Sequence, residues 1–266
     1  MTNRRFAVIL VLLAVSVSLS GCAALDTPSS EREASTPDPE AVFEGAYVHA
    51  DDLVDVTGVR RNKVTNGSHT LTEVMQVYDR PYVDQRTKVI DAPNSKRIGN
   101  VYVSNATKNW FYYPNAGVAQ YVEPAEPFTN DEVRSSRAEM AAMNLEKYDI
   151  EYNGTDQVAG RETHVLDVEA KNETVEKGIS AIVGDTEFVY ALETSNPRKE
   201  LRVVEQTLWI DTEYNYPLKE KVVFKVPGKE RIVMVEQFES VTFNSGLDDE
   251  TFAFEPPANA TVQNIT

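Results

Sequence analysis

The sequence predicts an α+β fold that consists mainly of antiparallel β-strands. Apolar and polar residues alternate along many short segments of the 266-residue chain, and this alternation is the period of a half-buried strand. Pairs such as Asn-Gly and Pro-Gly, which are typical of tight turns, separate these segments. Helical spacing of apolar residues is clear in far fewer places. We therefore expect an antiparallel sheet with helices packed against it.

The segment from Leu201 to Pro257 shows the strand pattern most clearly. One part of it places four apolar side chains on one face and three lysines on the other, namely Leu218, Val222, Phe224 and Val226 against Lys219, Lys221 and Lys225. Pro227-Gly228 follows, and it suits a type II turn because Pro restricts φ and Gly tolerates a positive φ. We expect a meander of antiparallel strands here.

The N-terminal half of the domain shows one helix and then a series of strands. Pro39 to Gly58 has apolar residues at three- and four-residue spacing and predicts a helix, with an irregular lead-in as the alternative. Strands are expected at 59–65, 71–78, 83–90, 98–104, 108–114 and 118–122. Asn66-Gly67 is the strongest hairpin signal among the intervening turns.

A second helix begins at Thr129. Thr129 and Glu132 have the spacing of a capping box, in which each side chain accepts a hydrogen bond from a free backbone N–H at the helix start. Met140 and Met143 lie along one side of this helix. They either pack on the sheet as core residues or line an adaptable apolar cavity.

The strand pattern returns from Tyr148 to Glu169, with a turn at Gly160. The segment 170–199 then interrupts it and has room for a short helix, so we interpret it as an insertion or a lid. Residues 258–266 are expected to form a frayed tail.

The first 21 residues have the features of an export signal. Arg4 and Arg5 precede an apolar run that is shorter than the ~20 residues of a spanning helix. The segment Leu19-Ser20-Gly21-Cys22 resembles the lipobox of lipoprotein signal peptides. That resemblance implies cleavage before Cys22 and a lipid on its sulfur, and the alternative is an uncleaved membrane anchor. The two arginines leave the export route open between the general and the twin-arginine pathway.

Residues 22–40 are rich in Pro, Ser, Thr and acidic residues, and poor in large apolar ones. Such a segment cannot compensate for its ordering entropy by burial, so we expect a flexible, lipid-anchored tether. Six Asn-x-Ser/Thr triplets are candidate glycosylation sites on an exported chain, at Asn66, Asn105, Asn153, Asn172, Asn259 and Asn264.

The charge balance is strongly acidic, with 42 acidic against 26 basic residues and a net charge of −16. Removal of the signal peptide would make it −18, because two arginines leave with it. A nucleic acid partner is therefore not expected, since phosphate binding requires a basic surface. The dispersed acidic excess is explained either by ordinary solubility or, as the slightly favoured alternative, by adaptation to high salt (a halophilic protein).

The usual signals of catalysis are missing from the sequence. His49, His69 and His164 lie in different predicted elements and lack the spacing of zinc ligands. The chain has no Gly-x-Ser-x-Gly, Walker or Gly-x-Gly-x-x-Gly motif. We therefore expect no enzyme activity, no metal and no cofactor, and interpret the chain as a binding protein.

Several segments together resemble the lipoprotein-carrier superfamily (LolA/LolB-like proteins and related lipid-binding lipoproteins). They are Trp110-Phe111-Tyr112-Tyr113-Pro114, Leu208-Trp209-Ile210-Asp211 with Tyr216-Pro217-Leu218-Lys219, and Asn244-Ser245-Gly246-Leu247-Asp248-Asp249 with Phe252-Ala253-Phe254-Glu255-Pro256-Pro257. The resemblance implies one domain at 41–262, a strongly curved, half-open β-barrel with helices as a lid or plug. It also implies an apolar cavity for acyl chains.

By this resemblance, Trp110, Tyr112, Met140, Met143 and Trp209 are candidates to line the cavity, although plain core packing explains each aromatic equally well. The implied function is that of an extracytoplasmic protein, anchored to the cell membrane through Cys22, that binds or transfers a lipid or the lipid moiety of an acylated protein. Burial of acyl chains away from water contributes about 0.8 kcal/mol of binding free energy per CH₂. Such binding requires no reactive group. The alternative is a sensor or interaction module on the same fold, with an envelope protein as its partner.

Overall fold

The computed structural model describes residues 36–172, 202–225, 227–228 and 230–266. The described residues from Pro37 onward belong to one compact unit that extends to Thr266. The signal peptide, Cys22, most of the predicted tether and almost all of the segment 170–199 lie outside the described residues. None of the described helices is both long and apolar enough to cross a membrane.

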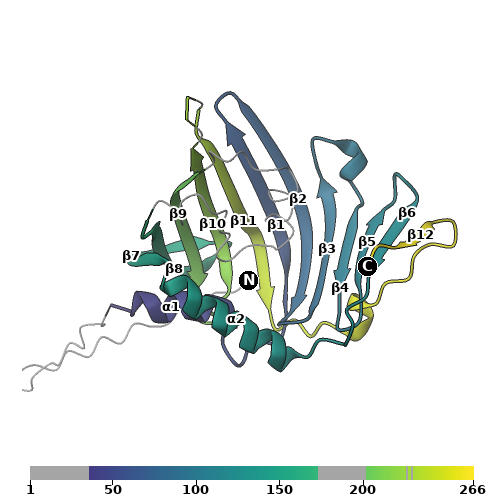
Figure 1. Cartoon of the computed structure of the whole chain (residues 1–266), viewed down its shortest axis with the longest axis horizontal. Coiled ribbons are helices and arrows are strands. Elements are labelled where there is room, and N and C mark those ends of the chain that lie inside the picture. Colours follow the sequence, from purple (N-terminus) through teal and green to yellow (C-terminus); the bar gives the residue numbers. More distant parts are fainter. Residues whose placement is uncertain (1–35, 173–201, 226, 229) are drawn as a thin grey trace, which may run out of the picture. The chain divides into compact units, whose positions relative to one another are not determined.

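The described residues of this unit form a 12-stranded sheet, two α-helices and two short 3₁₀ turns (Figure 1). The strands are β1 (Val56–Asn66), β2 (His69–Arg80), β3 (Asp84–Asp91), β4 (Val101–Ser104), β5 (Asn109–Tyr113), β6 (Val118–Val122), β7 (Tyr148–Val158), β8 (Arg161–Ala170), β9 (Arg202–Asp211), β10 (Pro217–Lys225), β11 (Ile232–Phe243) and β12 (Thr261–Asn264). Their order in the sheet is β12-β6-β5-β4-β3-β2-β1-β11-β10-β9-β8-β7. All neighbours are antiparallel except β12 and β6.

This architecture confirms the predicted α+β class with a mainly antiparallel sheet. The predicted hairpin at Asn66-Gly67 connects β1 and β2, with Gly67 at φ 55°. The described strands do not close on themselves, because β12 and β7 form the two ends of the sheet. A barrel is therefore not confirmed.

Both helices begin where the sequence predicts. Helix α1 (Pro39–Val48) has Asp38 as its N-cap, and α2 (Asn130–Leu145) has the capping box of Thr129 and Glu132. The prediction that the first helix extends to Gly58 was wrong. His49, with φ 52° and ψ 174°, ends α1, and β1 begins only seven residues later.

The C-terminal end of the chain also differs from the prediction. Residues 258–266 were expected to be frayed, but Thr261–Asn264 pairs in parallel with β6. Before it, Asp248 caps the short turn η2 (Asp249–Phe252). The second short turn, η1 (Ser95–Arg97), connects β3 and β4.

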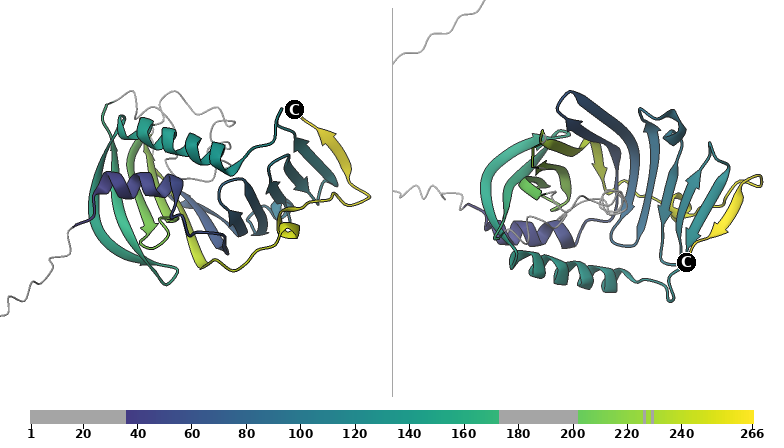
Figure 2. Two further views of the ribbon diagram at one scale, coloured as in Figure 1. Left: turned by 90° about the horizontal axis from the view of Figure 1, so that it is seen from below. Right: turned by 45° about the horizontal axis from the view of Figure 1, so that its top comes forward.

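Two layers cover the sheet, and they lie on opposite faces. Helices α1 and α2 lie side by side at the end formed by β7, β8 and β9, and α2 extends from there so that its first residue, Asn130, contacts Tyr82 between β2 and β3 (Figure 2). The C-terminal segment packs Phe254 and Ala260 on Val103 and Trp110 of β4 and β5. Directly opposed residues of neighbouring strands share a face, and the register from β9 to β5 assigns the two layers to different faces. We call the helix-covered face the inner face and the other the outer face.

Candidate ligand-binding face

The inner face begins under the two helices. Leu208 and Ile210 of β9 are fully buried there, in a cluster with Phe43 and Tyr47 of α1 and Ala141 of α2. Because side chains alternate along a strand, Leu208 and Ile210 face the helices and Trp209 between them points away. The helices make their main contacts with β7 and β8, while the inner face continues across β10, β11, β1 and β2.

A polar row crosses the continuation of the inner face. Glu220 of β10 lies opposite Glu236 of β11, which lies opposite Asn62 of β1. Glu220 is only 4% exposed and accepts a 2.7 Å hydrogen bond from Nε2 of Gln206. Burial raises the pKa of Glu220 to about 8, and the nearby charge of Glu236 adds to the shift. Glu220 is therefore mostly protonated at neutral pH.

Glu236 has a cationic partner in the same row. Its Oε1 lies 3.1 Å from Nη1 of Arg60, and both side chains are largely buried. Arg60 also lies near the ring of Phe238, with its Cζ 6.0 Å from the centroid. The row thus combines one ion pair with a protonated carboxyl group, and its net charge is close to zero.

Apolar residues flank the polar row on both sides. Toward one side lie Val222, Phe224 and Met234, which are buried, with Val64, Val203 and Ile232 half-buried beside them. Toward the other side lie Met75, Val77, Leu218 and Phe238 of the large core cluster. An inner face of this composition suits an amphiphilic molecule, because long apolar chains and a polar group would each have matching surroundings.

The helices meet the sheet at a junction around His49. This ring is buried, stacks on Tyr82 with 5.9 Å between ring centroids, and lies 5.0 Å from the ring of Tyr216. Nη1 of Arg137 on α2 is 3.4 Å from its Nε2. Burial lowers the pKa of His49 to about 3, with a further contribution from the charge of Arg137, so the ring is neutral at pH 7. A neutral imidazole next to a guanidinium acts as a hydrogen-bond acceptor here.

Helix α2 is attached to the rest of the unit by few buried groups. Of its 16 residues only Ala141 and Asn144 are buried. Nδ2 of Asn144 donates a 2.9 Å hydrogen bond to the hydroxyl of Tyr47 on α1. Leu145 is half-buried against the same core cluster. Further contacts are polar and closer to the surface, including Asn130 Oδ1, which accepts a hydrogen bond from the backbone N–H of Tyr82. Weakly packed segments of this kind are those that open locally.

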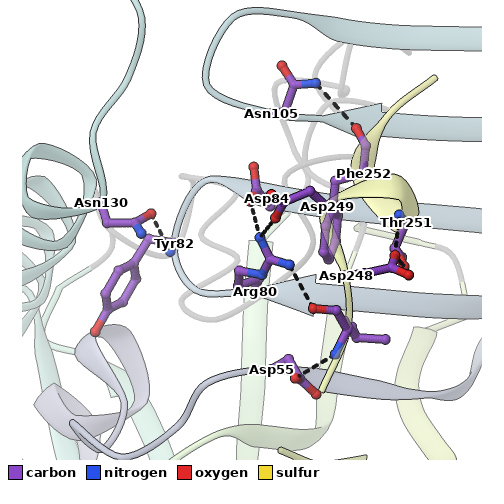
Figure 3. A network of polar contacts seen from close by, with 11 residues as sticks. Asp55, Arg80, Tyr82, Asp84, Asn105, Asn130, Asp248, Asp249, Thr251 and Phe252 are labelled. Carbon is purple, nitrogen blue, oxygen red and sulfur yellow. Dashed lines mark hydrogen bonds and ion pairs between the residues drawn. The ribbon is translucent and has the colours of Figure 1, made fainter. Parts of the chain in front are cut away.

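The C-terminal layer is attached quite differently, by the polar network that Figure 3 shows. Asp55 accepts hydrogen bonds of 2.7–3.0 Å from the backbone N–H groups of Ser245, Gly246 and Leu247 and from the Ser245 hydroxyl. Burial alone would raise the pKa of Asp55, but these hydrogen bonds outweigh it and lower the pKa. A charged carboxylate thus fixes the loop that follows β11.

Arg80 holds the next part of the same segment. Its Nη2 donates to the carbonyl oxygen of Leu247 at 2.8 Å, and its Nη1 donates to Asp84 and to Asp249. Its Cζ lies 4.9 Å from the ring centroid of Phe252. This segment is therefore fixed by charged hydrogen bonds at several points.

The structure places the five predicted cavity residues in three separate regions. Trp110 and Tyr112 both contact Phe254 on the outer face, under the C-terminal layer. Trp209 points to the opposite side of β9 from Leu208 and Ile210, and it belongs to the large core cluster that also contains Leu218. Lys219 Nζ lies 3.7 Å from its ring centroid, and its Nε1 donates a hydrogen bond to Asp156. Met140 and Met143 are exposed on α2. That these residues border one cavity stays a prediction.

Sequence reasoning missed the polar row. Glu220 stands between Leu218 and Val222, on the apolar face of the alternating strand, and this position was the available signal. The other members come from β9, β11 and β1, so only the sheet register brings them together. In the described part of the chain, no group of three His, Cys, Asp or Glu side chains could hold a metal ion.

Comparison with family models and with curated protein sequences found no match. Solved structures gave distant similarities. An uncharacterized conserved protein from Thermus thermophilus is 10% identical, with a TM-score of 0.46, 85% of this chain covered and 96% of that one. The MucA/MucB complex of Pseudomonas aeruginosa is 13% identical, with a TM-score of 0.45 and coverage of 84% and 61%. A LolA superfamily protein from Nitrosomonas europaea is 11% identical, with a TM-score of 0.37 and coverage of 82% and 99%.

Proposed function

We propose that this chain is a non-catalytic, extracytoplasmic binding protein that is tethered to the membrane through Cys22. Its ligand would be a lipid, or the lipid moiety of an acylated protein, held on the inner face. The observation that carries the proposal is the composition of that face, in which apolar residues of five strands flank a nearly neutral polar row. The lipobox-like segment that ends at Cys22 supports the tether.

The attachment of α2 supports the same proposal. An occupant of the inner face needs a route past the helices, and α2 has only two buried residues to release. Its exposed Met140 and Met143 are flexible, polarizable side chains that adapt to different apolar surfaces. Opening of α2 would therefore give acyl chains access to the inner face without loss of the C-terminal layer.

The test is native mass spectrometry of the full chain, extracted from its own membranes in a mild detergent. We expect lipid to co-purify and added phospholipid to raise the melting temperature. Val64→Gln, on the inner face, should reduce the bound lipid, whereas Lys63→Gln, the next residue and on the outer face, should not. Absence of both co-purified lipid and a thermal shift would show that the proposal is wrong.

A second candidate is a protein-interaction module, and the exposed Met140 and Met143 favour it as well. In that case α2 would be a docking surface that stays closed on α1. Cross-linking in intact cells through a photoreactive residue at position 143 should then give one defined protein adduct, and the lipid measurements above should be negative.

A further inference from the structure

The four-residue strand β12 is an edge strand without a charged residue, a proline or a bulge. Among the described strands it pairs only with β6, and all four of its residues are exposed. The apolar residue Val262 is 48% exposed. Residues 256–266 include no Asp, Glu, Lys or Arg. Natural proteins protect such edges by keeping them short or by adding charges, prolines or bulges. β12 is short, with four residues, but it contains no charge, proline or bulge, so its free edge is able to pair with another strand.

The opposite edge of the sheet is better protected. β7 has a register shift between Tyr152 and Thr155, which bends the edge, and it carries Asp149, Glu151 and Asp156. A bulge and repeated acidic charges both disfavour pairing with a second acidic chain. Of the two edge strands, β7 therefore has a bulge and acidic charges that disfavour pairing, and β12 has neither.

Two glycosylation acceptors stand at the ends of β12. Asn259 and Asn264 are both exposed. Oδ1 of Asn264 accepts hydrogen bonds from the backbone N–H and the hydroxyl of Thr266, at 2.9 and 2.7 Å. No described residue holds its Nδ2, which is the atom that would be modified. In contrast, Nδ2 of Asn105 donates to the carbonyl oxygen of Phe252 at 3.3 Å, and this side chain is half-buried.

The number of acceptor triplets is also higher than chance. The chain has 17 asparagines and 36 serines and threonines in 266 residues, so about two Asn-x-Ser/Thr triplets are expected from composition, against the six that occur. Two of the six fall within the six residues 259–264, at the unprotected edge.

We propose that Asn259 and Asn264 carry N-linked glycans and that these glycans prevent β12 from pairing with a second copy of this chain. The donor would be an oligosaccharide linked through phosphate to a lipid. The amide nitrogen forms a bond to the anomeric carbon of the sugar, the bond from that carbon to the phosphate oxygen breaks, and the amide loses a proton as the lipid phosphate leaves. The proposal depends on the proposed export of the chain and is independent of its ligand.

The first test is glycopeptide mass spectrometry of the full chain purified from its own cells. We expect glycans at Asn259 and Asn264 and an unmodified Asn105. Unmodified Asn259 and Asn264 would overturn the proposal. A glycan at Asn105 with none at β12 would do the same, since it would show that exposure does not select the site.

The second test concerns the role of the glycans. The double variant Asn259→Gln/Asn264→Gln, as the full chain in detergent, should sediment as dimers or larger species at concentrations where the wild type and the control Asn105→Gln are monomeric. Adding Val262→Lys to the double variant should restore the monomer, because a charge in the middle of the edge replaces the protection. A double variant that stays monomeric, or self-association that Val262→Lys leaves unchanged, would overturn the shielding role.

Discussion

The helix layer and the C-terminal layer cover opposite faces of one sheet, and they are attached by different kinds of contact. α2 depends on two buried residues, on the half-buried Leu145 and on polar contacts near the surface. The C-terminal segment is fixed by the buried carboxylate of Asp55 and by hydrogen bonds from Arg80 to Leu247 and Asp249. Charged hydrogen bonds contribute roughly twice as much as neutral ones. The C-terminal layer over β4 and β5 is therefore held more firmly than α2 on the inner face.

The largest effect is expected at Asp55. In Asp55→Asn the hydrogen bonds to Ser245, Gly246 and Leu247 lose their charged acceptor, and an amide NH₂ group would face backbone N–H groups. We expect a loss of about 3 kcal/mol in the free energy of unfolding, measured by urea denaturation at pH 7. Asp249→Asn, an exposed partner of Arg80, is the control and should cost under about 1 kcal/mol.

The same carboxylate predicts a loss of stability in acid. The pKa of Asp55 is lower in the folded than in the unfolded chain, so its contribution is complete above the unfolded pKa and is lost as the pH falls through the folded one. The wild type should therefore lose more stability than Asp55→Asn as the pH is lowered below about 4. Equal acid sensitivity of the two proteins would contradict this assignment.

The next largest effect is expected at Glu220 on the inner face, where stability should change with pH in the opposite direction to that at Asp55. Its pKa of about 8 is above its ordinary value, so the folded chain binds the proton more tightly than the unfolded chain does. Stability should therefore fall as the pH rises from about 4.5 to about 8. Glu220→Gln keeps the shape of the side chain and removes the titrating group. We expect its free energy of unfolding at pH 8 to exceed that of the wild type by on the order of 2 kcal/mol. Parallel pH profiles would contradict the prediction.

The elements of both layers could be predicted largely from local signals. The capping box of Thr129 and Glu132 defines the start of α2, and the alternation in Leu218–Phe224 defines β10. The end of α1 was missed because the apolar spacing continues past His49, where the backbone leaves the helical region. β12 was missed because a four-residue exposed strand has no apolar face, and its pairing with β6 is a long-range contact.

The candidate site was less predictable than the elements around it. Its polar row combines residues of four strands, and a register shift of one residue would place each of them on the outer face. The aromatic residues chosen from the sequence are large and apolar, which predicts burial without distinguishing one face from the other. Trp209, next to two inner-face residues, shows this directly.

A smaller effect is expected at the attachment of α2. Asn144→Ala removes the hydrogen-bond donor to the Tyr47 hydroxyl and should lower the free energy of unfolding by about 1–2 kcal/mol. Because the loss is local, hydrogen exchange should become faster in α2 while the amides of Gly246 and Leu247 keep their protection. Uniform acceleration across both layers would show that α2 does not open as a separate unit.

The smallest effect on stability is expected at Met140 and Met143. Both side chains are about half exposed, so Met140→Ser/Met143→Ser should change the free energy of unfolding by no more than about 0.5 kcal/mol per site. If α2 contacts the ligand when its cover opens, the same variant should nevertheless bind less lipid by native mass spectrometry, because two adaptable apolar contacts are lost. Ser135→Ala/Ser136→Ala, on exposed positions of the same helix, is the matched control. If the methionine variant binds as much lipid as the wild type, the ligand contacts the inner face of the sheet but not Met140 or Met143, and α2 acts only as a cover.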